Sequence, residues 1–170
     1  MFVRTAGRRD VQSIRELLVE TWHAAYDGIY GATKVTEITD DWHSLTSLTA
    51  QLNKPFSEFL VADDGKEIGG VAFASTGADG RTVMLHQLYV RPAHQGHGIG
   101  GMLLDEIIAS FHEAELMRLE VDEANARAIL FYRTQGFVEA GYTANCGGGR
   151  SGIPALIFER RLLNAADKAT

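Results

Sequence analysis

A glycine-rich segment in the middle of the chain has the residue types and spacing to hold a phosphate. Four glycines, at Gly96, Gly98, Gly100 and Gly101, lie close together, and an apolar pattern of helical spacing begins at Ile99. Glycines let backbone N–H groups face a ligand, and the start of a helix carries partial positive charge. The segment therefore predicts an anion-binding turn whose ligand is a phosphate or pyrophosphate group.

The same glycines fit a dinucleotide pattern. Gly96, Gly98 and Gly101 satisfy G-x-G-x-x-G, and Glu120 follows about 20 residues later, as in nicotinamide-dependent oxidoreductases. In that fingerprint, however, the first glycine comes almost directly after a strand. Here a polar loop that contains Pro92 separates the strand-like run from the glycines. The spacing therefore argues against a dinucleotide site.

The second pattern in the segment is Gln95-x-x-Gly98-x-Gly100. It resembles the acyl-CoA loop of the GNAT superfamily of N-acetyltransferases, whose pattern is Gln/Arg-x-x-Gly-x-Gly/Ala. A further stretch matches the family pattern N-x-x-A-x-x-x-Y-x-x-x-G-F in the same order. Its positions are filled by Asn125, Ala128, Tyr132, Gly136 and Phe137. Two motifs in register are far more specific than one, so the chain resembles this family.

The resemblance implies transfer of an acetyl group from acetyl-CoA directly to a primary amine, with no metal in the site. It leaves the acceptor open between a small amine, an amino acid, an antibiotic, and a protein N-terminus or lysine. An alternative is a non-catalytic acyl-CoA-binding regulatory module. The residues implied for cofactor binding are Leu88, Tyr89, Val90, Gln95, Gly96, His97, Gly98, Ile99, Gly100, Gly101, Asn125 and Tyr132. Tyr132 would also protonate the leaving thiolate.

The general base is a separate question. Many family members carry a glutamate on or near the fourth strand, and residues 82–91 contain none. His86 resembles the histidine at this strand in arylalkylamine N-acetyltransferases, and an imidazole is suited to relaying a proton at neutral pH. Glu120 on the predicted fifth strand is the second candidate, and a chain of water molecules is the third.

Aromatic and imidazole side chains gather in the N-terminal helical section, where the family usually builds its acceptor pocket. They are Trp22, His23, Tyr26, Tyr30, Trp42 and His43. Tyr26 and Tyr30 are the better candidates for contact with the acceptor. The tryptophans can equally be core residues that pack a helix on a sheet.

The elements that would position these residues follow from the hydrophobic periodicity. Strands are expected at residues 2–5, 59–62, 68–74, 82–90, 117–121, 137–143 and 154–161, and helices at 10–26, 32–52, 99–111 and 125–134. A break near Thr39 would interrupt the second helix. The predicted fold is α/β, with a mixed seven-stranded sheet splayed between strands four and five and four helices. Residues 1–164 are expected to form one domain, and 165–170 a frayed tail.

Composition narrows the class of protein. The net charge of −6 argues against a general nucleic-acid surface, which needs clustered lysine and arginine. Apolar runs are too short to span a membrane, and charged residues interrupt the beginning of the chain, so no export signal is expected. The single cysteine, Cys146, fits a reducing compartment. We therefore predict a cytoplasmic protein, and the sequence leaves open whether it forms a homodimer.

Overall fold

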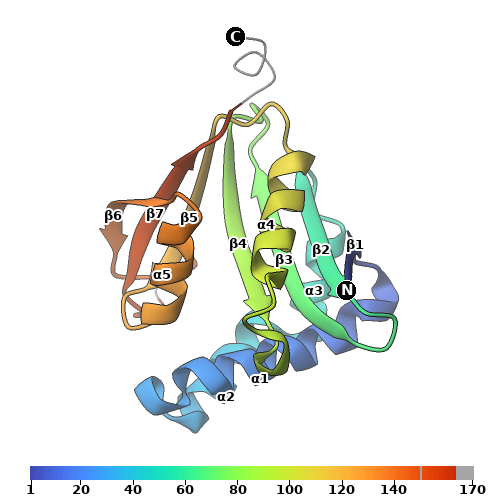
Figure 1. Ribbon diagram of the computed structural model, residues 1–170. Helices are drawn as coiled ribbons and strands as arrows, with labels where there is room; N and C mark the ends of the chain where they lie inside the picture. Colours follow the sequence, from blue (N-terminus) through green and yellow to red (C-terminus); the bar gives the residue numbers. More distant parts are fainter. Residues whose placement is uncertain (150, 164–170) are drawn as a thin grey trace. The chain divides into compact units, whose positions relative to one another are not determined.

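The computed structural model describes residues 1–149 and 151–163, and Figure 1 shows the arrangement of its elements. Seven strands form one sheet in the order β1-β2-β3-β4-β5-β7-β6. Their bounds are β1 Phe2–Thr5, β2 Ser57–Asp63, β3 Ile68–Thr76, β4 Thr82–Val90, β5 Leu116–Asp122, β6 Val138–Thr143 and β7 Ala155–Arg161. The sheet is mixed, because Thr82–Leu85 of β4 pair in parallel with Leu116–Leu119 of β5, whereas β5, β6 and β7 pair antiparallel. The predicted seven-stranded mixed sheet is confirmed. Its splay between β4 and β5 stays a prediction.

The number of helices differs from the prediction of four. The described residues form five α-helices, α1 Val11–Tyr30, α2 Ala32–Trp42, α3 Leu45–Leu52, α4 Ile99–Ser110 and α5 Ala126–Thr134. The expected second helix is two, because Ser44 adopts an extended backbone and its hydroxyl accepts a hydrogen bond from the Ser47 N–H at 3.1 Å. The break therefore lies at His43 and Ser44, and not at Thr39.

Arg15 of α1 secures this break. Its guanidinium donates to the carbonyl oxygens of Thr39 and His43, at 3.2 and 2.8 Å, and pairs with the Asp40 carboxylate at 2.8 Å. Both carbonyls lie at the C-terminal end of α2, where the Thr39 carbonyl also accepts the His43 N–H, so the positive guanidinium lies where the helix dipole is negative. The first helix is also longer than predicted. It continues through Gly28 and stops at Gly31, whose φ of 84° and ψ of 148° form a backbone conformation that is open mainly to glycine.

The chain forms two units, and each is described separately below. The first comprises Met1–Phe73 and Gln87–Ile107, and the second comprises Ala74–His86 and the described residues from Ile108 onward. Strands β3 and β4 contribute residues to both units. The predicted frayed tail, residues 165–170, lies outside the described residues.

In the first unit, helices pack on both faces of the strands. Alternate residues of a strand point to opposite faces. On one face, Val71 and Phe73 of β3 lie in a buried core with Leu17 and Leu18 of α1 and Leu48 of α3. On the other face, α4 approaches so closely that a Cβ at Gly70 would lie 2.9 Å from both Ile99 and Leu103. The absence of a side chain at Gly70 therefore lets the N-terminal half of α4 pack directly on β3.

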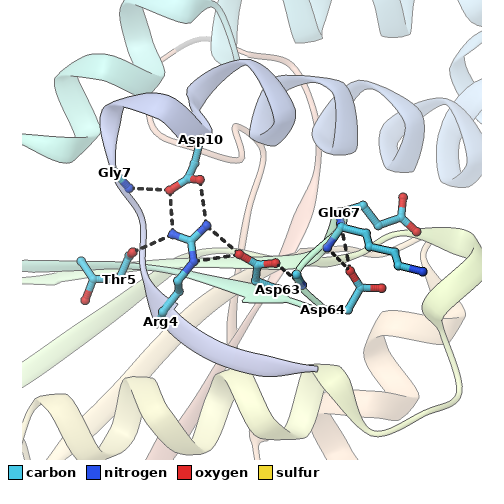
Figure 2. Close-up of polar contacts among 9 residues, drawn as sticks. Arg4, Thr5, Gly7, Asp10, Asp63, Asp64 and Glu67 are labelled. Atoms are coloured by element: carbon cyan, nitrogen blue, oxygen red, sulfur yellow. Dashed lines mark hydrogen bonds and ion pairs between the residues drawn. The ribbon is translucent and has the colours of Figure 1, made fainter.

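An ion-pair network ties the N-terminal strand to the start of α1 and to the hairpin between β2 and β3 (Figure 2). Arg4 binds both oxygens of Asp10 at 2.8 Å and also pairs with Asp63 at 2.8 Å. The Gly7 N–H donates to the same Asp10 carboxylate at 2.7 Å. The Arg4 hydrogen bonds hold the pKa of Asp10 below its usual value, and the Gly65 N–H and Arg4 do the same for Asp63. Both carboxylates therefore stay ionised and fix the edge of the sheet.

In the second unit, β5 pairs with β7 and β7 with β6. Residues of β5 and β7 align from Leu116 opposite Arg161 to Asp122 opposite Ala155, and Arg118 forms an ion pair with Glu159 at 2.5 Å across them. This pairing fixes Glu120 in the middle of β5.

Candidate active site

The predicted phosphate turn lies in the first unit, between β4 and α4. Gly96 and Gly98 have φ values of 83° and 80°, which side chains rarely adopt, and a Cβ at either position would meet no atom within 4 Å. The first intrahelical bond recorded at this end of α4 runs from the Met102 N–H to the Gly98 carbonyl at 3.1 Å. The backbone N–H groups of residues 99–101 therefore belong to the first turn of the helix, whose N–H groups have no acceptor within the helix and can donate to a ligand. This geometry suits an anion.

Side chains around the turn hold it against the end of β4. The Gln95 amide donates to the Val90 carbonyl at 2.9 Å, which closes residues 90–95 into a compact loop. Arg91 pairs with Glu20 of α1, and its backbone N–H donates to the Gly69 carbonyl at 2.8 Å. The turn is thus braced before any ligand binds, so its donors lose little freedom on binding.

The two histidines of the turn differ in their surroundings. His94 is half-buried, and its Nε2 lies 2.7 Å from a carboxylate oxygen of Glu67. His97 is exposed, and its Nδ1 lies 3.2 Å from the His94 carbonyl. Of the two, His97 is therefore the one whose ring is open to solvent beside the glycines.

A continuous group of rings lies in the same unit, and we call it the aromatic cluster. It consists of Trp22, Tyr26, Tyr30, Trp42, His43 and Tyr89. Trp22 is at its centre, with ring centroids 4.6 Å from Tyr26 and 6.5 Å from Tyr89 of β4. Tyr30 stacks 5.8 Å from Tyr26 and is half-buried. The cluster therefore connects the helices α1 and α2 to the strand segment that the family resemblance assigns to the cofactor.

Two polar side chains inside the cluster lack partners. His43 and Trp22 are 4% and 5% exposed, and neither the imidazole nitrogens nor the indole Nε1 has a hydrogen-bond partner among the described residues. Burial, together with the positive charge of Arg15, lowers the pKa of His43 to about 4. The imidazole is therefore neutral at physiological pH. Trp22 is a core residue, whereas Trp42 is half-buried. A buried donor without a partner, such as the Trp22 indole, is costly and so unusual in a core.

In the second unit, His86 is exposed on β4, and its Nε2 lies 2.7 Å from the hydroxyl oxygen of Ser75 on β3. Ser75 itself is buried, at 7% exposure. The imidazole is therefore anchored on one side by a hydroxyl of the neighbouring strand. Ser75 was not among the residues predicted for the site. The available signal was a hydroxyl residue at the end of an otherwise apolar run.

Glu120, the second candidate base, is engaged by the loop after β6. The Gly147 N–H donates to its carboxylate at 2.7 Å, and the Cys146 thiol also hydrogen-bonds to it. Burial is the largest cause, and the Glu120 charge the next, of a pKa of Cys146 that is raised to about 12. The thiol therefore stays protonated, which removes the thiolate that a cysteine nucleophile needs.

The second motif caps α5 at both ends. Asn125 accepts a hydrogen bond from the Ala128 N–H at 3.1 Å, as an N-cap does. At the other end Gly136 has a φ of 88°, its N–H donates to Arg133, and the Phe137 N–H donates to the Tyr132 carbonyl at 3.0 Å. This is a Schellman arrangement. Most of the motif therefore fixes the length of the helix.

The same capping arrangement positions Tyr132. Its ring is buried, at 9% exposure, and contacts Phe137 edge-to-face with centroids 5.6 Å apart. The hydrophobic contact across a Schellman cap is made here by the motif's own tyrosine and phenylalanine. Tyr132 is thus held in a fixed orientation, which both a packing role and a role in proton transfer would use.

Comparison with known proteins identifies the family. The sequence profile of the acetyltransferase (GNAT) family matches residues 11–137, which include both motifs and the aromatic cluster. The chain belongs to this family. Within residues 11–137, the GNAT assignment accounts for the order of β4, the glycine turn, α4, β5 and α5.

Similarity to individual proteins supports the assignment. The chain is 32% identical over 108 residues to the N-alpha-acetyltransferase RimI of Mycobacterium tuberculosis, a match that covers 61% of this chain and 66%, just under two thirds, of that protein. Its fold is similar to that of the PaiA N-acetyltransferase from Thermoplasma acidophilum in complex with coenzyme A, with a TM-score of 0.83 at 22% identity over 95% and 98% of the two chains. The Escherichia coli ribosomal-protein-S18-alanine N-acetyltransferase has a TM-score of 0.71 at 18% identity, over 96% of this chain and 95% of that one.

Two features are absent from the described residues. None of their helices has the length and apolar character that crossing a bilayer requires. Nor do residues 1–149 and 151–163 bring three or more histidine, cysteine or acidic side chains together in a way that could hold a metal ion.

Proposed function

We propose that this protein transfers an acetyl group from acetyl-CoA to a primary amine. The observation that carries the proposal is the braced turn after β4, in which Gly96 and Gly98 adopt left-handed conformations at the start of α4. In a GNAT chain this turn is where the pyrophosphate of the cofactor would accept hydrogen bonds from backbone N–H groups. Small residues are needed there because the backbone N–H groups themselves would contact the pyrophosphate.

The remaining cofactor contacts would come from β4 and α5. Leu88, Tyr89 and Val90 would pair through their backbone with the pantetheine arm, and an N–H near Leu88 would polarise the thioester carbonyl. The loop donors would come from Gln95, Gly96, His97, Gly98, Ile99, Gly100 and Gly101. Asn125, in addition to capping α5, would contact the cofactor or hold Tyr132 in place.

Proton transfer requires an acid and a base. We assign the acid to Tyr132, whose phenol would protonate the thiolate of CoA as it leaves. We assign the base to His86 in preference to Glu120. The imidazole is exposed and anchored by Ser75, whereas the Glu120 carboxylate already accepts the Gly147 N–H. The amine would lose its proton to His86, and the neutral amine would then attack the thioester.

The acceptor would lie against the aromatic cluster, with Tyr26 and Tyr30 as its first contacts. Support comes from the position of the cluster beside Tyr89 on the cofactor strand. The acceptor is an amine-bearing molecule, and a protein N-terminus comes first among the candidates because RimI is an N-alpha-acetyltransferase. Small amines, amino acids, antibiotics and lysine side chains complete the set.

The test is release of free CoA thiol from acetyl-CoA in the presence of an amine panel. The panel should contain one member of each acceptor class, including short peptides with free and blocked N-termini. Thiol release that depends on one amine class, with mass spectrometry showing the acetylated product, supports the proposal. Tight binding of acetyl-CoA without thiol release for any amine would favour the alternative, a non-catalytic acyl-CoA-binding module. Preference for a nicotinamide dinucleotide over CoA would contradict both.

We further propose a cytoplasmic location, which the single cysteine supports. Cell fractionation would check the location. Light scattering on the purified protein would decide between a monomer and a homodimer.

A further inference from the structure

The loop that joins β6 to β7 contains a run of three glycines. Gly147, Gly148 and Gly149 have φ values of 78°, 78° and 69°, and a Cβ at Gly148 or Gly149 would meet no atom within 4 Å. Glycine loses more conformational freedom on ordering than any other residue. A run of this kind therefore keeps one conformation only where another group holds it.

A hydrogen bond ties this loop to β5. The Gly147 N–H donates to Oε2 of Glu120 at 2.7 Å, and the Cys146 thiol bonds to the same carboxylate. Bonds such as that from the Cys146 N–H to the Ile153 carbonyl, at 2.8 Å, close the loop on itself. A backbone N–H can only donate, so the direction of the Gly147 bond is fixed, and a carboxylate is a strong acceptor for it.

Glu120 follows directly on the last residue of β5 that is in register with β4. The parallel register runs from Thr82 opposite Leu116 to Leu85 opposite Leu119. The next residues of the two strands are His86, which we assign as the base, and Glu120, and both belong to the second unit. The carboxylate therefore brings the loop to the level of the sheet at which the acceptor amine would meet His86.

We propose that Glu120 is a positioning residue for the acceptor. Its carboxylate accepts the Gly147 N–H and so holds the loop beside His86, where the loop backbone forms one side of the acceptor site. An amine that approaches His86 then meets an ordered surface, and less conformational freedom is lost when it binds. This inference rests on the proposed acetyltransferase function, and it gives Glu120 a role that does not require it to take a proton.

The decisive measurement is the exchange of the Gly147 amide proton with water. Because Cys146 is the single cysteine, full-length protein labelled with ¹³C-carbonyl cysteine and ¹⁵N-glycine contains one directly bonded labelled pair. A carbonyl–amide correlation spectrum therefore shows Gly147 alone. We expect exchange to be slow in the wild-type protein and roughly 10-fold faster in Glu120→Ala. Glu120→Gln should lie between them, because its amide oxygen still accepts the bond but carries no charge.

Kinetics with the active amine supplies the second readout. Glu120→Ala should raise KM for the amine by roughly 3- to 10-fold, the scale of one hydrogen bond, and should change kcat and KM for acetyl-CoA much less. Glu120→Gln should recover most of the affinity for the amine. Glu123→Ala removes an exposed carboxylate just after β5 and is the matched control, which should change neither the exchange nor KM. Thermal melts would show whether each variant is folded.

The outcomes separate the inference from the function on which it rests. A wild-type Gly147 amide that exchanges as fast as the amide in Glu120→Ala overturns the inference, and so does a folded Glu120→Ala enzyme with a normal KM for the amine. An equal loss of kcat in Glu120→Gln and Glu120→Ala also overturns it, because the carboxylate would then act as the base. If the wild-type protein releases no thiol with any amine, the proposed function fails. The role in acceptor binding then fails with it, whereas the exchange measurement still shows whether Glu120 holds the loop.

Discussion

Replacement of Gly98 by glutamate is the sharpest test of the phosphate turn. The position has a φ of 80°, and a Cβ there would meet nothing within 4 Å. The new side chain therefore fits sterically, and its cost to folding comes from the backbone conformation, about 1–2 kcal/mol. Gly65, in the hairpin between β2 and β3, has a φ of 89° and is equally open. Gly65→Glu is thus a matched control with the same strain and the same added charge.

The two variants should differ only in cofactor binding. Each should melt a few degrees below the wild-type protein, as a loss of about 1–2 kcal/mol implies for a chain of this size. A carboxylate about 5 Å from a phosphate costs about 1–3 kcal/mol for each pair of like charges. Gly98→Glu should therefore bind acetyl-CoA roughly 30-fold more weakly or worse, whereas Gly65→Glu should bind it normally.

Calorimetric titration with CoA and thermal melts of the same samples would make the comparison. Gly98→Ala adds the backbone strain without the charge and should weaken binding less than Gly98→Glu. Equal CoA affinity in Gly98→Glu and Gly65→Glu, with both proteins folded, would refute the assignment of this turn to the pyrophosphate.

The other predictions concern the proton-transfer residues and the ion-pair network. Tyr132→Phe should lower the chemical rate by roughly 100-fold or more with little change in CoA affinity, because it removes the acid and keeps the ring. Tyr142→Phe on β6 is the control and should be neutral. Stopped-flow measurement of thiol release would test both variants, and near-normal turnover in Tyr132→Phe would mean that Tyr132 is a packing residue. In the wild-type protein kcat/KM should rise with pH through the range in which histidine titrates, and His86→Ala should lose this rise and regain activity at high pH, where free amine is abundant. A larger loss of activity in Glu120→Gln would instead assign the base to Glu120. Asp10→Asn should destabilise the fold by about 2 kcal/mol at pH 7, because it breaks the bonds to the buried carboxylate. Since the folded-state pKa of Asp10 lies below its unfolded value, the wild-type protein keeps this stabilisation above about pH 4 and loses it as the pH falls through the folded-state pKa, so the two melting curves should converge in acid.

Local signals in the sequence were sufficient for most elements. The strand β4 is observed at Thr82–Val90 as predicted, and α4 ends one residue before its predicted end. These two segments have strong periodicity and clear boundaries, because Pro92 and the glycines lie between them and polar loops lie at their outer ends. The caps of α5 were readable for the same reason, because Asn125 and Gly136 act on backbone groups only a few residues away.

Signals with two local interpretations were less reliable. Residues 32–52 carry an apolar pattern that suits one helix or two. Two helices form because Ser44 caps the start of α3 and the Arg15 side chain hydrogen-bonds to the carbonyl of His43 at the end of α2. The first helix was expected to end at Tyr26, but it continues through Gly28 to Tyr30 and ends at Gly31. The position of the break between α2 and α3 depends on a contact from another helix, and the end of α1 depends on the backbone conformation of one glycine.

The sequence by itself determined the family, and it predicted the phosphate turn and the residues that the family's chemistry would use, because these depend on residue types at fixed spacing. Only the tertiary structure decided which other groups contact these residues. The Ser75 hydroxyl contacts His86 from the neighbouring strand, the Gly147 N–H donates to the Glu120 carboxylate, and His43 is buried and neutral beside Trp22. Each of these contacts joins residues that are well separated in the chain. Periodicity and motifs describe neighbours along one element, whereas hydrogen bonding and desolvation depend on which elements pack together.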